Sequence, residues 1–94
     1  MSNNNIILTI FPNPFNSTIN ITWKQKKQNH VLVEIFNIKG EKVNIITDEI
    51  YFAGTHCKSW NALDLNGASI VSGLYICSLK IGDLSISKKM ILIR

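Results

Sequence analysis

Short runs of alternating apolar and polar residues, separated by glycine-containing turns, restrict the fold of this chain more than any other feature. In the run 30–36, Val31, Val33 and Ile35 share one face of an extended backbone. Alternation with a period of two is typical of a β-strand with one buried face. Similar runs predict further strands at 6–10, 19–23, 42–47, 55–60, 74–81, 84–87 and 90–93. No stretch has a sustained helical period with caps, so we expect no helix.

The turn residues indicate how these strands are arranged. The strands are interrupted by Gly40, Gly54, Gly67, Gly73 and Gly82. Gly82 and Asp83 lie between two alternating runs, which is typical of a two-residue hairpin. About seven short strands punctuated in this way predict an all-β fold, an immunoglobulin-like antiparallel β-sandwich. A small barrel has similar signals and is the alternative.

The strand patterns also predict the core and the extent of the domain. A chain of 94 residues suits one hydrophobic core, so we expect residues 1–94 to form a single domain. The predicted core consists of Val31, Val33, Ile35, Trp60, Tyr75, Leu79, Met90 and Leu92. Cys77 shares the face of Tyr75, whereas Cys57 faces away from Trp60, which argues against a disulfide between the two cysteines. Lys58 shares the face of Trp60 and is expected at a sheet margin, where its ammonium reaches water.

Composition and charge argue against several partners. The chain has 46% hydrophobic and 17% charged residues, which is typical of a globular protein. It lacks the run of about 20 apolar residues that a membrane helix needs, so we expect no membrane insertion. The net charge of +4 makes nucleic acid a partner to consider, but nine of the ten basic residues are lysine. Lysine lacks the planar fork that recognises bases. The densest lysine cluster, at 24–27, is expected in a hairpin loop, and we predict no nucleic-acid binding.

No residues in the sequence form a recognisable catalytic or metal-binding pattern. No nucleophile lies in a frame such as Gly-x-Ser-x-Gly. The adjacent carboxylates Asp48 and Glu49 are expected beside a loop and on opposite faces, unsuited to paired acid–base work. We therefore expect no enzyme activity and no cofactor.

One loop has a partial likeness to a calcium site. Asp64, Asn66 and Gly67 match the start of a calcium loop, but Ile70 and Tyr75 stand where further ligands are needed. We interpret this segment, together with the following Gly73, as a turn motif that binds no metal.

Both prolines of the chain lie in the stretch Phe11-Pro12-Asn13-Pro14-Phe15. Each proline fixes φ and removes a backbone donor, and each residue before a proline is pushed toward an extended conformation. The segment is therefore stiff and cannot pair as an interior strand. We interpret Pro12, Asn13, Pro14 and Phe15 as the motif that starts the folded domain, and expect Phe11 and Phe15 to close the end of the sandwich.

Four segments in order carry a resemblance to a known family. They are FPNPFNSTINITW, VLVEIFNIKGEKV, AGTHCKSWNALDLNGASIVSGLYICSLKIGD and KKMILIR. The sequence from Leu8 to Arg94 resembles the type A C-terminal sorting domain of cargo proteins of the type IX (Por) secretion system. It also shares its pattern with the immunoglobulin-like domain of the flagellar hook-cap protein family.

The resemblance implies a role in protein export. In that family, a sandwich at the end of a larger protein follows a cargo domain, and a Sec signal carries the precursor to the periplasm of a Gram-negative bacterium. The folded domain is recognised by an outer-membrane translocon. A sortase-like surface protease then typically removes it and attaches the cargo to the cell surface. The alternative is a structural or adhesion module similar to the hook-cap domain. A sorting signal must end its reading frame, as this chain does after its basic, apolar tail.

The tail has an alternation of its own. Met90 and Leu92 are predicted to face the core, which leaves Ile91 and Ile93 on the outer face. Exposed apolar residues on a terminal strand indicate a docking surface, and the resemblance implies that export depends on the extreme C-terminus. The hypothesis is that the translocon reads a surface that includes Lys89, Met90, Ile91, Leu92, Ile93 and Arg94. The alternative is that the tail is a core strand only.

Overall fold

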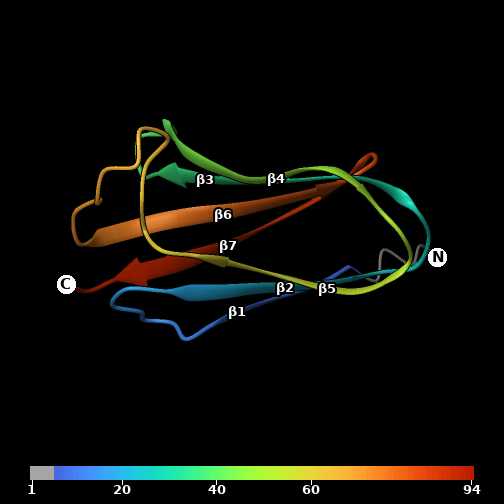
Figure 1. Ribbon diagram of the computed structural model, residues 1–94, viewed down its shortest axis with the longest axis horizontal. Helices are drawn as coiled ribbons and strands as arrows, with labels where there is room; N and C mark the ends of the chain where they lie inside the picture. The colour runs from blue at the N-terminus through green and yellow to red at the C-terminus, as the bar shows by residue number, and fades with distance from the viewer. Residues whose placement is uncertain (1–5) are drawn as a thin grey trace.

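The computed structural model describes residues 6–94, which form two stacked antiparallel sheets (Figure 1). The strands are β1 (Ile7–Phe11), β2 (Ile19–Gln25), β3 (Asn29–Asn37), β4 (Lys42–Tyr51), β5 (Gly54–Trp60), β6 (Gly73–Ile81) and β7 (Leu84–Leu92). One sheet has the order β1-β2-β5 and the other the order β4-β3-β6-β7. This is the immunoglobulin-like sandwich that the sequence predicts, and the barrel alternative is wrong. Residues 6–94 contain no helix, and so none that could span a membrane.

The core lies between the two sheets and contains all eight of the residues predicted for it. The predicted core residues of β3, β6 and β7 are at most 6% exposed, and Trp60 on β5 is 4% exposed; those of the first three strands are Val31, Val33, Ile35, Tyr75, Leu79, Met90 and Leu92. Burying one such side chain contributes about 1.5–3 kcal/mol. The alternation of the sequence therefore accounts for most of the driving force that holds the sheets together.

The last strand is longer than the sequence predicts. The runs at 84–87 and 90–93 are parts of one strand, β7, which pairs with β6 from Leu84 opposite Ile81 to Leu92 opposite Gly73. The two-residue turn at Gly82 and Asp83 is confirmed. Lys88 shares the inner face with Met90 and so interrupts the apolar pattern, yet it is exposed. Because β7 is at the edge of its sheet, this lysine reaches water without leaving the strand.

Two further boundaries differ from prediction. Lys24 and Gln25 belong to β2, so the expected loop begins only at residue 26. Gln25 is buried because its amide is satisfied: its Oε1 accepts from Trp23 Nε1 at 2.9 Å, and its Nε2 donates to the carbonyls of Lys27 and Tyr51. Asp48 and Glu49 lie within β4 and not beside a loop.

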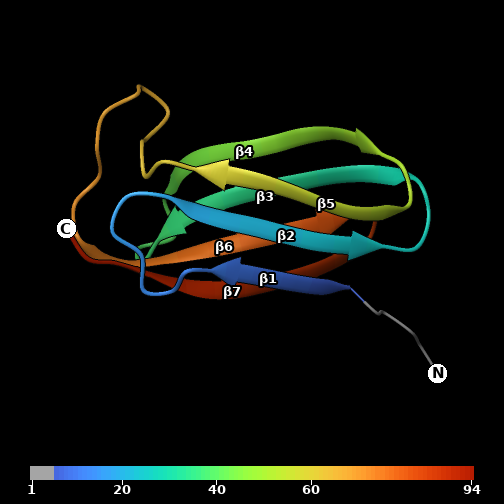
Figure 2. The same cartoon turned by 60° about the horizontal axis from the view of Figure 1, so that its bottom comes forward.

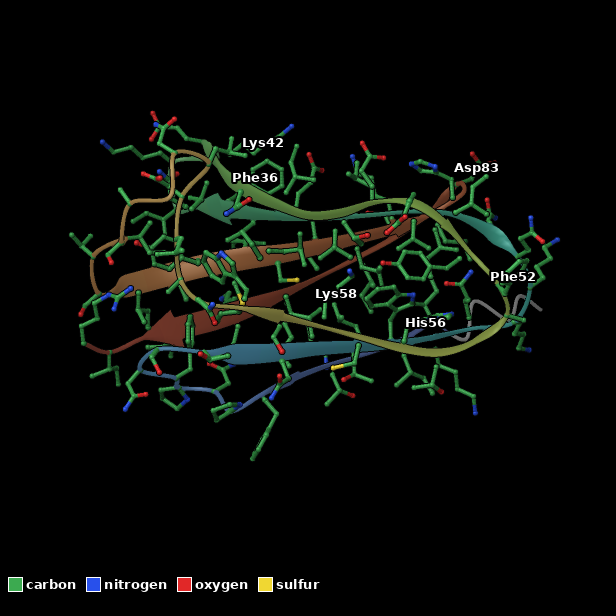
Figure 3. All side chains as sticks on the ribbon, viewed as in Figure 1. Phe36, Lys42, Phe52, His56, Lys58 and Asp83 are labelled. Carbon is green, nitrogen blue, oxygen red and sulfur yellow. The ribbon has the colours of Figure 1, made fainter. Side chains whose placement is uncertain are left out.

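The cysteines and Lys58 lie where the sequence places them. Cys77 is fully buried, Cys57 is exposed, and both are free thiols. Burial raises the pKa of the Cys77 thiol to about 12. Lys58 and His56 project from β5 toward the side occupied by the other sheet (Figure 3), but β5 is an edge strand and both side chains are only half-buried.

Candidate functional site

The proline segment joins the two sheets and does not start the fold. β1 precedes it and pairs with β2, from Ile7 opposite Lys24 to Phe11 opposite Asn20. After the prolines the chain reaches the other sheet, where Phe15 forms a parallel bridge with Leu92 at the edge of β7. The expectation that this motif marks the first residues of the domain is therefore wrong. Because proline has no N–H and cannot continue a ladder, the segment is suited to end one pairing and start another.

Asn13 binds the edge of β7 through its side chain. Its Nδ2 donates to the Lys89 carbonyl at 3.0 Å, and its Oδ1 accepts from the Ile91 N–H at 3.0 Å. The side-chain Nδ2 thus supplies a donor where the neighbouring prolines have no N–H, and Oδ1 supplies the acceptor beside it. Phe15 continues the row, because its N–H donates to the Ile91 carbonyl at 2.9 Å and its carbonyl accepts from the Ile93 N–H at 2.8 Å. Four hydrogen bonds therefore close the edge of the tail.

The two phenylalanines beside the prolines differ in burial. Phe15 is buried, with its ring centroid 6.1 Å from that of Trp60, and it closes the end of the core as predicted. Phe11 is 68% exposed, so the expectation that it also plugs the sandwich is wrong. It ends β1 on the face shared with Ile7 and Thr9, which points away from the other sheet because Leu8 points inward.

The turn motif has the predicted form. Asp64 Oδ1 accepts from the N–H groups of Asn66 and Ala68 at 2.8 and 2.9 Å, and Gly67 has a φ of +82°. This is an Asx turn with a glycine in the left-handed region. Gly73 begins β6 opposite Leu92. In residues 6–94, no three His, Cys, Asp or Glu side chains are placed to hold a metal ion together.

The loop that contains this turn, residues 61–72, joins β5 to β6 and is tied to the tail by Arg94. The Arg94 N–H donates to Ser72 Oγ at 2.9 Å, its Nε to the Ile70 carbonyl at 2.7 Å, and its Nη2 to the Ala62 carbonyl at 3.1 Å. Burial raises the pKa of the nearby Tyr75 hydroxyl, and the positive charge of Arg94 lowers it in part. Arg94 was predicted only as part of the tail, and no local pattern in the sequence predicts its contacts with this loop.

The proline segment, the loop 61–72 and the tail therefore meet at one end of the sandwich, near the C-terminus (Figures 1 and 2). Met90 and Leu92 belong to the core, as predicted. Several large apolar side chains at this end remain exposed: Val71 (76%), Leu65 (59%), Ile93 (55%), Ile91 (43%) and Leu74 (37%). Ile91 lies opposite Leu74 on the outer face of the four-stranded sheet, and Ile93 lines a shallow hollow with Pro12, Pro14, Phe15 and Asn16. An apolar group of this kind indicates an interaction surface.

A family model described as the secretion system C-terminal sorting domain matches residues 9–93 of the chain. The chain belongs to this family. A sorting domain of this kind is a signal of the type IX (Por) secretion system, and it marks the protein that carries it for export to the cell surface or the extracellular space. A search of curated proteins finds no match.

Two solved structures from Porphyromonas gingivalis contain a domain with the same fold as this sorting domain. One is dimeric latent PorU, at 22% identity and a TM-score of 0.70, which aligns with 92% of this chain and 9% of that protein. The other is PorZ, a surface component of the type IX secretion system, at 20% identity and a TM-score of 0.62, with 93% and 11% covered. The sorting domain thus spans about a tenth of either protein, and at this identity the likeness concerns the fold.

Proposed function

We propose that this sorting domain is the export label of a larger cargo protein, and that the outer-membrane translocon of the type IX system binds it at the end where the proline segment meets the tail. The observation that carries the proposal is the exposure of Ile91, near the end of a strand whose edge is already closed, and of Ile93 just after that strand. Asn13 and Phe15 occupy the outer hydrogen-bonding groups from Lys89 to Ile93, so a partner cannot add a strand there. It must bind through side chains, and the available ones are apolar.

The domain itself performs no chemistry in this proposal. Its role is to be recognised as a folded module after a Sec signal has brought the precursor to the periplasm. A sortase-like surface protease then removes the domain from the cargo. The family match favours this role over a structural module of the hook-cap type.

The test separates recognition from folding. The domain is fused to a secreted reporter in a host with a type IX system, and Ile91→Ser is combined with Ile93→Ser. Both side chains are substantially exposed, so the double variant keeps the core intact. Its folding is checked by thermal unfolding of the purified domain. We expect surface delivery of the reporter to be lost.

The matched control is Ile7→Ser combined with Ile50→Ser, which makes the same chemical change at two positions that are 56% and 63% exposed and lie outside the proposed surface. This control is expected to be delivered normally. Normal delivery of the folded Ile91→Ser/Ile93→Ser variant, or an equal loss in both double variants, would show that the translocon does not read this surface.

A further inference from the structure

The loop 61–72 has no strand partner over most of its length, so its position depends on side chains that bind its carbonyl groups. Trp60 Nε1 and Asn44 Nδ2 both donate to the Leu63 carbonyl, at 3.0 and 2.7 Å. The Tyr75 hydroxyl donates to the Val71 carbonyl at 2.7 Å. All three donors come from strands of the sandwich. Arg94 is different, because it holds the loop from the tail.

The arginine side chain is suited to this position by its geometry. Its Nη2 donates to the carbonyl of Ala62, near the start of the loop, and its Nε donates to the carbonyl of Ile70, near the end of the loop. These two residues are paired with each other, since the Ile70 N–H donates to the Ala62 carbonyl at 3.2 Å. A planar guanidinium presents parallel donors in a fixed fork, whereas the lysine ammonium is a single point of charge. Ala62 is fully buried with a φ of +58°, an unfavourable conformation for alanine that such contacts help to maintain.

The loop that Arg94 holds carries two of the most exposed apolar side chains at this end, Leu65 and Val71, and both line one hollow beside Tyr75. Val71 lies between Ile70 and Ser72, each of which accepts a hydrogen bond from Arg94. The tail contributes Ile91 and Ile93 at the same end. Replacing the arginine removes the hydrogen bonds from its Nε and Nη2 to the loop, and in the described residues leaves only the backbone N–H of residue 94, bound to Ser72 Oγ, to connect the loop to the tail.

We propose that Arg94 is a positioning residue for export: it fixes the loop 61–72 against the tail, so that Leu65 and Val71 form one docking surface with Ile91 and Ile93. The partner is an apolar surface of the type IX machinery, which binds both parts together. The inference rests on the proposed function of the tail, but it assigns the loop to the surface and gives Arg94 a role that its charge alone does not provide.

The first experiment measures the contact itself in the purified domain. Arg94→Gln is compared with Lys89→Gln, which removes the same charge from the tail at a side chain that makes no hydrogen bond or ion pair with the loop. We expect hydrogen exchange of the amides in 62–72 to accelerate about tenfold in Arg94→Gln and to stay unchanged in Lys89→Gln, with β3 and β6 still protected in both. Unchanged exchange in Arg94→Gln would overturn the positioning role, whatever happens in export.

The second experiment measures export with the same reporter fusion. We expect delivery to fall in Leu65→Ser/Val71→Ser and in Arg94→Gln, and to fall also in Arg94→Lys, which keeps the charge but loses the fork. Full delivery of Arg94→Lys with a loosened loop would show that the charge is read directly and would overturn the inference. Loss of delivery in Ile91→Ser/Ile93→Ser together with normal delivery of Leu65→Ser/Val71→Ser would overturn the role of the loop but leave the proposed function standing. Normal delivery of both pairs would refute the proposed function, while the exchange experiment still decides whether Arg94 holds the loop.

Discussion

Replacement of Asn13 by alanine is expected to destabilise the domain by about 1–2 kcal/mol. The change removes two hydrogen bonds, from Asn13 Nδ2 to the Lys89 carbonyl and from the Ile91 N–H to Asn13 Oδ1, both 3.0 Å long. A hydrogen bond contributes about 0.5–1.5 kcal/mol net, so the pair contributes about 1–3 kcal/mol. Asn13 is exposed, and water can satisfy part of what the edge of β7 loses, which favours the lower half of that range.

The assay is thermal unfolding followed by tryptophan fluorescence. In a domain of this size, 1 kcal/mol corresponds to about 4–8 °C in Tm, so the expected change is well resolved. The matched control is Asn16→Ala, since Asn16 is also exposed and its Oδ1 accepts only a long hydrogen bond from Ser17 Oγ, at 3.4 Å. Asn13→Asp is expected to be at least as destabilising as Asn13→Ala, because an oxygen would then face the Lys89 carbonyl. Stabilities of Asn13→Ala and Asn16→Ala within about 0.5 kcal/mol of each other would refute the claim that Asn13 binds the tail.

Three further predictions concern the core and the turn. Val33→Asp buries an unpaired carboxylate and is expected to cost at least about 3 kcal/mol in urea unfolding, whereas Ile38→Asp, at a position 72% exposed, is nearly neutral; similar midpoints would contradict the assigned register. At pH 8 a thiol reagent is expected to modify Cys57 rapidly and Cys77 only after unfolding. Equal reactivity of the two thiols would contradict the burial of Cys77. Because burial raises the pKa of Cys77 from 9.0 to about 12, this thiol ionises in the unfolded state first, and the free energy of unfolding is expected to fall as the pH rises from 9 to 12. Calcium is expected to leave the Tm unchanged, since two N–H groups already occupy Asp64 Oδ1, and a rise of several degrees at micromolar calcium would show a site.

The sandwich and its core were predictable because they depend on local alternation. A strand with one buried face must repeat every second residue, and β3 and β6 do so along their central parts, at Val31, Val33 and Ile35 and from Tyr75 to Ile81. The same alternation shows why the prediction that Phe11 closes the end of the sandwich was wrong. Since Leu8 points inward, Phe11 must share the outward face of Ile7 and Thr9.

The contacts of the tail were not predictable in this way. The segments that bind β7 and Arg94 come from distant parts of the chain, and no period or turn signal indicates that Asn13 faces Lys89. Glu34 presents the same difficulty. It lies at an outward position of β3 yet is buried, because Lys42 pairs with it at 2.9 Å and a second lysine lies nearby at 4.0 Å. Such partners follow from sheet order, which alternation within one strand does not determine.

The hydrogen bonds of Asn13 connect residues 76 and 78 positions apart in the chain. Contacts between such distant segments form late, because the intervening chain must first be ordered. During synthesis the proline segment emerges early, but its partner strand is among the last parts of the domain to leave the ribosome. A polypeptide that stops before β7 cannot present the end surface at all, even when everything upstream is intact. Synthesis through the end of the tail is therefore a condition for the label to be readable, and a protein truncated before β7 carries no export mark.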